Sequence, residues 1–192
     1  MNTIVDRHNK ELNKQQIDAL FFELNKELRK KMRKIPKDFK ANLYVVGGAC
    51  VVAKLQSRYS TNDIDAMWDI GSEMRDCINA VGDRLDLGHT WCNCDFKKTK
   101  SYTDAIVTNC KVYKEFDRLI VRMVNLDLLL AMKLVAFRMD RKHDLEDIRN
   151  IIKTLVQNGV LVNCEYITET IIKYYGGLNN LSNGAISFIR RL

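Results

Sequence analysis

The chain has 192 residues, and its 31 Lys and Arg residues against 24 Asp and Glu give a formal net charge of +7. A hydrophobic fraction of 46% excludes a disordered chain, and a single proline excludes a collagen-like or proline-rich one. No stretch approaches the roughly 18 consecutive apolar residues that a membrane span requires. We therefore expect one soluble domain, or one domain with an additional helical portion, and no membrane partner.

The N-terminal residues and the cysteines bear on the cellular compartment. The N-terminus is polar and lacks the apolar core of a signal peptide, which predicts a cytoplasmic protein with its six cysteines reduced. His89, Cys92, Cys94 and Cys110 would also supply four zinc ligands. Their C-x-C spacing departs from the usual C-x₂-C, so scattered reduced thiols are the simpler interpretation.

The first predicted element is an amphipathic helix over residues 15–34. Apolar residues recur there at three- and four-residue spacing, and Pro36 ends the helix because the residue before a proline disfavours helical backbone. The segment 26–40 holds eight basic residues and two acids. This basic segment would attract a phosphate backbone, or it would simply be a solvated helix face.

The next elements alternate between strand and helix. An apolar strand at 43–46 ends at Gly47-Gly48 and is followed by a short helix at 49–56 and a polar turn at 58–62. Residues 63–68 alternate polar and apolar side chains, which indicates a strand. A helix at 72–81 follows, with Ser72 as its predicted N-cap. The region 86–114 is expected to mix short strands with loops.

The C-terminal half is predicted to be mostly helical. A strand at 119–124 leads into an apolar helix at 128–137, capped by Asn125 or Asp127, and into an amphipathic helix closed by Asn158-Gly159. The last predicted helices span 144–157, 164–175 and a turn or two after Gly176-Gly177. The order of elements predicts an α/β (α+β) protein with a small mixed sheet. The expected divisions are an N-terminal basic helix (1–40), an α/β core (41–125) and a helical portion (126–192).

Asp63 and Asp65 are the most informative residues. Side chains two residues apart on a strand project from the same face, and two adjacent carboxylates repel unless a cation lies between them. Mg²⁺ commonly binds one or two carboxylates together with substrate phosphates. Gly47 and Gly48 let the backbone approach a bound group, and the helix that follows directs its N–H groups toward a phosphate. A D-x-D pair alone would be explained by a solvated sheet edge. The combination of a strand, the Gly-Gly pair, a short helix, a polar turn and the D-x-D pair is a far more specific indication of a metal and phosphate site.

Residues 43–155 resemble the nucleotidyltransferase superfamily typified by DNA polymerase beta, through Gly47, Gly48 and the run Thr61-Asn62-Asp63-Ile64-Asp65. Segments 129–134 and 141–148 are similar to small bacterial nucleotidyltransferase-like proteins of abortive-infection and toxin–antitoxin systems. The resemblance implies transfer of a nucleoside monophosphate from a nucleoside triphosphate (NTP), with Mg²⁺ or Mn²⁺, to an RNA (for example tRNA) or protein hydroxyl. The alternative is a catalytically silent protein of the same fold that binds a toxin–antitoxin partner or nucleic acid.

The resemblance also implies roles for individual residues. Asp63 and Asp65 would bind the metal ions, and a third acid would complete the catalytic and metal site. Asp95 is the first candidate for that acid, because it lies in the stretch Trp91-Cys92-Asn93-Cys94-Asp95-Phe96, and Glu115 and Asp117 are the alternatives. The nucleotide-binding residues would be Gly47, Gly48, Ser60, Thr61 and Lys133.

Lys133 and two nearby acids have alternative interpretations. Lys133 stands beside a strongly apolar helical face, where a lone ammonium is costly, so a phosphate would be a suitable partner. A lysine that extends its ammonium to solvent would explain the same position. Asp144 and Asp147 near a helix start suit a capping role, or an ion pair with Lys133 or Arg138.

Overall fold

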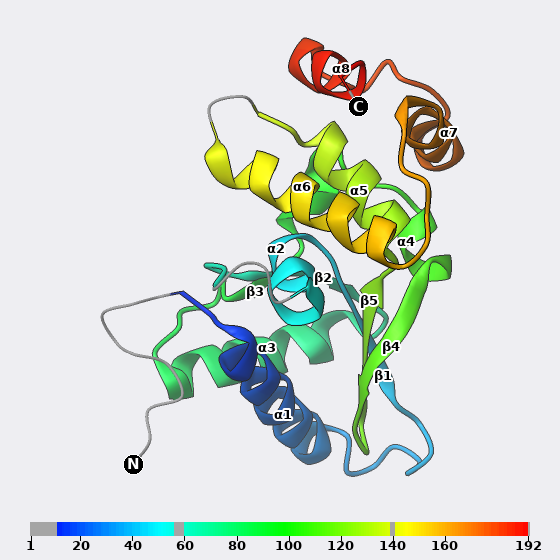
Figure 1. The fold of residues 1–192 in the computed structure, drawn as a ribbon. Coiled ribbons are helices and arrows are strands. Elements are labelled where there is room, and N and C mark those ends of the chain that lie inside the picture. Colours follow the sequence, from blue (N-terminus) through cyan, green and yellow to red (C-terminus); the bar gives the residue numbers. More distant parts are fainter. Residues whose placement is uncertain (1–10, 56–59, 139–140, 192) are drawn as a thin grey trace. The chain divides into compact units, whose positions relative to one another are not determined.

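The computed structural model describes residues 11–55, 60–138 and 141–191 (Figure 1). The chain divides into two compact units. Met1–Cys94 and Cys110–Met123 make up the first unit, and Asp95–Asn109 and Val124–Leu192 make up the second. Within the described ranges, no helix has the length and apolar character needed to cross a membrane.

A mixed β-sheet forms the centre of the first unit. In the described residues it has five strands in the order β3-β2-β1-β5-β4. The strands are β1 (Ala41–Val45), β2 (Ile64–Trp68), β3 (Cys92–Asn93), β4 (Cys110–Glu115) and β5 (Leu119–Val124). Strand β1 is parallel to β5 and antiparallel to β2, and β2 is parallel to β3. This sheet and the surrounding helices confirm the predicted α/β (α+β) class.

Helices pack beside this sheet. They are α1 (Lys14–Lys31), α2 (Gly47–Cys50), the π-helical η1 (Val51–Leu55) and α3 (Gly71–Leu85). Helix α1 packs against α3, and α2 packs against β2. The apolar stripe of α1, which includes Ile17, Phe21 and Leu24, is fully buried, as its spacing predicts.

Contacts between neighbouring residues define both ends of α1. Asn13 accepts a hydrogen bond from the Gln16 backbone N–H, and the Gln16 side chain accepts one from the Asn13 N–H, which forms a capping box. The helix ends at Lys31, and the Met32 N–H still donates to the Leu28 carbonyl. The predicted end at residue 34 is therefore a few residues too late.

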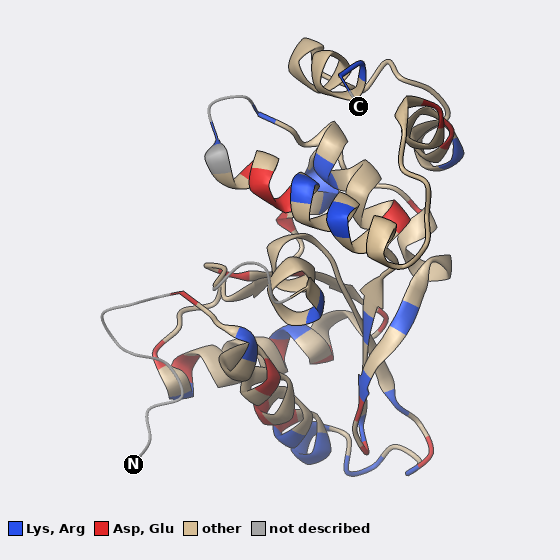
Figure 2. Ribbon diagram, in the orientation of Figure 1, with Lys and Arg blue, Asp and Glu red and all other residues tan. Residues whose placement is uncertain are grey.

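The basic segment 26–40 is largely paired with acids. Among the described residues, five of its eight cations form ion pairs, namely Lys26 with Glu23, Arg29 with Asp117, Lys30 with Glu27, Lys31 with Asp76 and Lys40 with Glu115. Figure 2 shows Lys and Arg gathered toward the C-terminal end of α1, with acidic residues on the same helix. This charge pattern favours the solvated-face interpretation of the segment over a phosphate-binding one.

The second unit is helical. It contains the 3₁₀ helix η2 (Asp95–Lys98) and the helices α4 (Ala105–Thr108), α5 (Leu126–Val135), α6 (Lys142–Gln157), α7 (Cys164–Tyr175) and α8 (Asn183–Ile189). Helix α5 is mostly buried and packs against both α6 and α7. The Asn125 side chain caps α5 by accepting a hydrogen bond from the Leu128 N–H over 2.9 Å. Asp127, the other predicted cap, instead accepts from the Tyr166 hydroxyl.

Two other predicted helix starts differ from the observed ones. The helix after the glycine pair begins at Gly47 rather than at residue 49 and becomes π-helical from Val51; its predicted last residue, Gln56, and residues 57–59 lie outside the described residues. Helix α3 begins at Gly71, and no side chain caps it. The predicted Ser72 cap is wrong because Ser72 lies inside the helix, where its hydroxyl contacts Glu73.

Candidate functional site

Gly47 and Asp65 lie in direct contact. The chain leaves β1 at Val45, and the Val46 N–H donates to the backbone carbonyl of Asp65 over 2.9 Å. Gly47 then adopts φ +64°, and a Cβ at this position would lie 2.7 Å from Asp65 Oδ2. A side chain here would strain the left-handed backbone and push the Asp65 carboxylate away from its observed position. The glycine therefore lets the Asp65 carboxylate lie against the backbone where α2 begins.

The two acids flank a buried strand residue. Ile64 is fully buried, whereas Asp63 and Asp65 on either side of it are half-buried. Strand β2 begins at Ile64, so Asp63 immediately precedes the strand. The burial pattern agrees with side chains that project from the face opposite Ile64, as their spacing predicts.

Asn93 is the residue that the structure adds to this pair. Strands β2 and β3 are paired so that Asp65 lies opposite Asn93. The Asn93 side-chain amide donates to Asp63 Oδ2 over 3.0 Å and to the Thr90 carbonyl over 3.3 Å. The three side chains of Asp63, Asp65 and Asn93, together with Gly47, define what we call the β2–β3 site.

The charges at this site act on a neighbouring thiol. Burial raises the pKa of Cys92, and the carboxylates of Asp65 and Asp63 raise it further. Cys92 precedes Asn93 on β3 and is paired with Ile64 in the sheet. The thiol therefore remains protonated near neutral pH and is not an activated nucleophile.

The donor set of the site fits a hard divalent cation. In the described residues, no group of three or more His, Cys, Asp and Glu side chains is placed to hold a metal ion. Two carboxylates are nevertheless what Mg²⁺ uses when it also binds substrate phosphates and water. The β2–β3 site therefore fits a metal ion that arrives with a triphosphate better than a cage made by protein ligands alone.

Ser60 and Thr61 lead into this site. Thr61 is buried, and its backbone exchanges two hydrogen bonds with Leu12, which forms an isolated antiparallel bridge. The Ser60 hydroxyl donates to Glu11 over 2.7 Å. These contacts fix the segment before Asp63 against the residues that precede α1. The role of Ser60 and Thr61 in nucleotide binding stays a prediction.

Asp95 and Lys133 belong to the second unit. Asp95 begins η2, and its side chain is 71% exposed and forms an ion pair with Lys98 over 3.0 Å. Lys133 contacts Asp147 over 2.6 Å, and their side chains are only 15% and 2% exposed. The predicted ion pair between Asp147 and Lys133 is therefore present in the structure. The catalytic role of Asp95 and the phosphate-binding role of Lys133 stay predictions.

The alternative third acids have partners elsewhere. Glu115, at the end of β4, pairs with Lys40, and β1 and β5 separate β4 from β2 in the sheet. Asp117 accepts a hydrogen bond from Asn25 and pairs with Arg29. Neither residue lies on a strand beside β2. On β3, the strand next to Asp63 and Asp65, the residue beside the two acids is therefore Asn93. In the sequence, Asn93 is indicated only by its position two residues before the candidate Asp95.

The zinc interpretation is wrong. His89, Cys92, Cys94 and Cys110 are all described, and no group of three metal-binding side chains occurs in the described part of the chain. His89 instead contacts Asp83 over 2.7 Å. Burial raises the pKa of Cys110 to about 11, so that thiol is protonated at neutral pH.

Comparison with known families identifies the family of the chain. A family model described as "Nucleotidyltransferase of unknown function (DUF6036)" matches residues 19–163, a range that contains the whole β2–β3 site. No curated protein and no solved structure matches the chain. Because the family model covers most of its length, the chain belongs to this family of nucleotidyltransferases of unknown function.

Proposed function

We propose that the protein transfers a nucleoside monophosphate from an NTP to a hydroxyl group of an RNA or a protein, with Mg²⁺ or Mn²⁺ held by Asp63 and Asp65. The observation that carries this proposal is the contact of the Asp65 carboxylate with Gly47, next to an Asp63 carboxylate held by Asn93. Asp65 thus lies where α2 begins, and Asp63 is held by β3. An abortive-infection or toxin–antitoxin setting and a cytoplasmic location complete the proposal.

The reaction is an in-line displacement at the α-phosphate. A bond forms between the acceptor oxygen and the α-phosphorus, the bond from that phosphorus to the bridging oxygen breaks, and pyrophosphate leaves. A bound divalent ion supplies positive charge to the attacking and leaving oxygens. The chain's own contribution is to hold the two carboxylates in fixed positions, through Gly47 for Asp65 and through Asn93 for Asp63. Asp95 as the acceptor of the hydroxyl proton and Lys133 as a contact of the triphosphate are the parts of the proposal that rest on the family resemblance alone.

One observation favours a second candidate function. The side chain next to the acid pair on β3 is a neutral amide rather than a third carboxylate. A protein that keeps the fold and binds a partner or nucleic acid without catalysis would not need the third acid. Only the catalytic alternative predicts that the nucleoside monophosphate is transferred from the NTP to an acceptor.

A transfer assay separates the two functions. The protein is incubated with Mg²⁺, each α-labelled NTP in turn, and total RNA or candidate partner proteins. Label transfer is expected, and Asp63→Asn and Asp65→Asn should each abolish it while the melting temperature stays close to that of the wild type. Asp38→Asn is the matched control, because Asp38 is exposed and outside the site. Absence of both transfer and an NTP-dependent thermal shift in the wild type would overturn catalysis and favour the silent alternative.

A further inference from the structure

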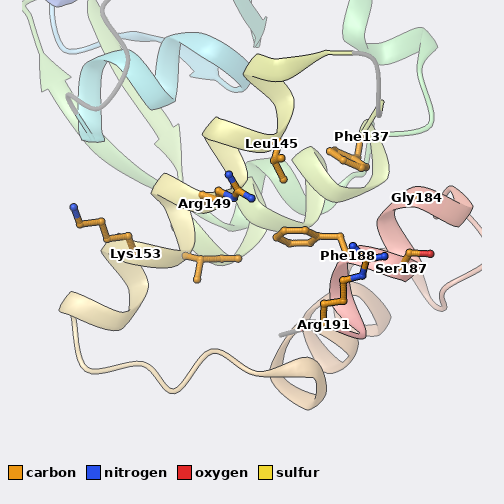
Figure 3. Close-up of a pocket in the computed structure, with 9 residues that line it drawn as sticks. Phe137, Leu145, Arg149, Lys153, Gly184, Ser187, Phe188 and Arg191 are labelled. Atoms are coloured by element: carbon orange, nitrogen blue, oxygen red, sulfur yellow. The ribbon is translucent and has the colours of Figure 1, made fainter.

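A cavity of about 550 Å³ lies within the second unit, bordered by α6, α8 and the end of α5 (Figure 3). Its apolar lining includes Phe137, Leu145, Ile152 and Phe188. The rings of Phe137 and Phe188 lie 6.4 Å apart between centroids and are tilted by 37°. Figure 3 shows the Phe188 ring reaching from α8 toward Leu145 and Arg149 of α6. The cavity therefore offers flat aromatic surface to a ligand.

Three cations line the same cavity. Arg149 and Lys153 are one turn apart on α6, and Arg191 follows the end of α8. All three side chains are exposed, and none forms an ion pair with any residue that the structure describes. None of the described residues that line the cavity is acidic. This pattern contrasts with α1, where most of the cations are already paired.

The ligand that fits must be both planar and anionic. Aromatic rings bind nucleobases by stacking, and exposed Arg and Lys bind phosphates. A single nucleotide within a strand carries a phosphate on each side of its base. The cations of this cavity come from α6 and from the residue after α8, so they can contact phosphates on two sides of a base. A nucleotide within a strand therefore fits the cavity better than a free mononucleotide, whose phosphate lies on one side only.

We infer that this cavity receives one unstacked nucleotide of a single-stranded nucleic acid, with its base against Phe188 and its flanking phosphates at Arg149, Lys153 and Arg191. The strand's role as the acceptor rests on the proposed function, but its binding does not. A duplex is excluded from this mode because its bases are stacked and paired. The apolar lining has few groups that could read base edges, so binding depends weakly on sequence.

Fluorescence anisotropy with a labelled oligouridylate of about ten nucleotides tests the inference on the full chain. The double variant Arg149→Gln/Arg191→Gln should raise Kd by about tenfold and reduce the slope of log K against log salt by about 2. Phe188→Leu, which keeps an apolar side chain, should raise Kd by about fivefold or more. Arg190→Gln is the control for the Arg191 substitution, because it removes one positive charge next to Arg191 but is not among the residues that line the cavity, and its Kd should stay within about twofold of the wild type.

Several results would overturn the inference. One is an equal loss of affinity in Arg190→Gln and in the Arg149/Arg191 variant, which would indicate only diffuse charge attraction. Others are an unchanged Kd in Phe188→Leu, or equal affinity for uridine monophosphate, for an RNA duplex or for an acidic tyrosine-rich peptide. The Asp63→Asn and Asp65→Asn variants should bind the oligonucleotide as the wild type does. If the wild-type protein binds the oligonucleotide but transfers no nucleotide, the proposed function is refuted, and the cavity still stands as a nucleic-acid binding site.

Discussion

Asn93 donates its side-chain amide to the carboxylate of Asp63 across the β2–β3 edge of the sheet, over 3.0 Å. A neutral donor therefore stabilises one of the two acids at a position where a third acid would repel it. The hydrogen bond orients Asp63 before any cation arrives. This relationship leads directly to a test of the metal-binding proposal.

Replacing Asn93 by Asp should increase the response to divalent cations. The new carboxylate would lie beside Asp63 and opposite Asp65, so without metal the three negative charges should lower the melting temperature. With Mg²⁺ or Mn²⁺ they should produce a larger thermal shift than the wild type shows. Asn93→Ser is the control that removes the amide without adding charge. Identical cation responses in Asn93→Asp and the wild type would count against a metal site at this edge.

Gly47→Ala should impair both stability and the site. The left-handed backbone at Gly47 costs a non-glycine residue about 1–2 kcal/mol, and the added Cβ would also displace the Asp65 carboxylate. We expect urea denaturation to show this loss and nucleotidyl transfer to fall more steeply than stability does. Gly71→Ala is the matched control, since nothing lies within 4 Å of a Cβ there. Equal activity in the two alanine variants would contradict the proposed role of Gly47.

The ion pair of Lys133 and Asp147 is expected to stabilise the second unit. Removing either partner breaks this contact between two largely buried side chains, and Lys133→Met or Asp147→Asn should lower the free energy of unfolding by about 3 kcal/mol. The double variant Lys133→Met/Asp147→Leu should be more stable than Lys133→Met alone. Chemical denaturation measures all three. A Lys133→Met protein with unchanged stability but weakened NTP binding would instead favour the phosphate-binding role of Lys133.

Glu23 should make folding depend on pH below neutrality. Burial raises the pKa of Glu23, but hydrogen bonds from Lys26 and Arg84 outweigh this effect and hold the pKa below its usual value of 4.5. A lowered pKa in the folded state adds stability above the unfolded pKa, and this stability is lost as the pH falls through the folded value. Glu23→Gln should therefore be destabilised at pH 7 by about 1 kcal/mol, and the difference from the wild type should shrink below about pH 4. Glu169→Gln, at an exposed position, should show no such trend.

The sequence predicted those features that depend on neighbouring residues. The strand at 119–124 and the helix at 164–175 have the predicted bounds, because apolar runs and caps define them locally. The acid pair and Gly47 were likewise recognisable from their spacing. The Ser72 cap is wrong because the N-cap position of α3 falls at Ile70, two residues earlier, which places Ser72 inside the helix.

The features that the sequence missed depend on distant residues. Asn93 lies beside Asp65 only because β2 and β3 pair in one particular register. The cavity requires α6 and α8 to border the same space, and Arg149 and Arg191 are far apart in the sequence. The charge of the basic segment was also misleading on its own, since Lys31 and Arg29 find their acids at Asp76 and Asp117.

The paired cations of α1 also affect how fast an anionic partner would be captured. An ion pair behaves as a dipole, whose field weakens with distance more steeply than that of a single charge. The net charge of +7 already subtracts these acids, so the paired cations of α1 add little to the long-range attraction of a diffusing polyanion. Lys30→Gln alone lowers the net charge by one and should slow the association as the loss of any other cation would, whereas Lys30→Gln/Glu27→Gln removes the whole pair and should leave the rate and its decline with added salt nearly unchanged.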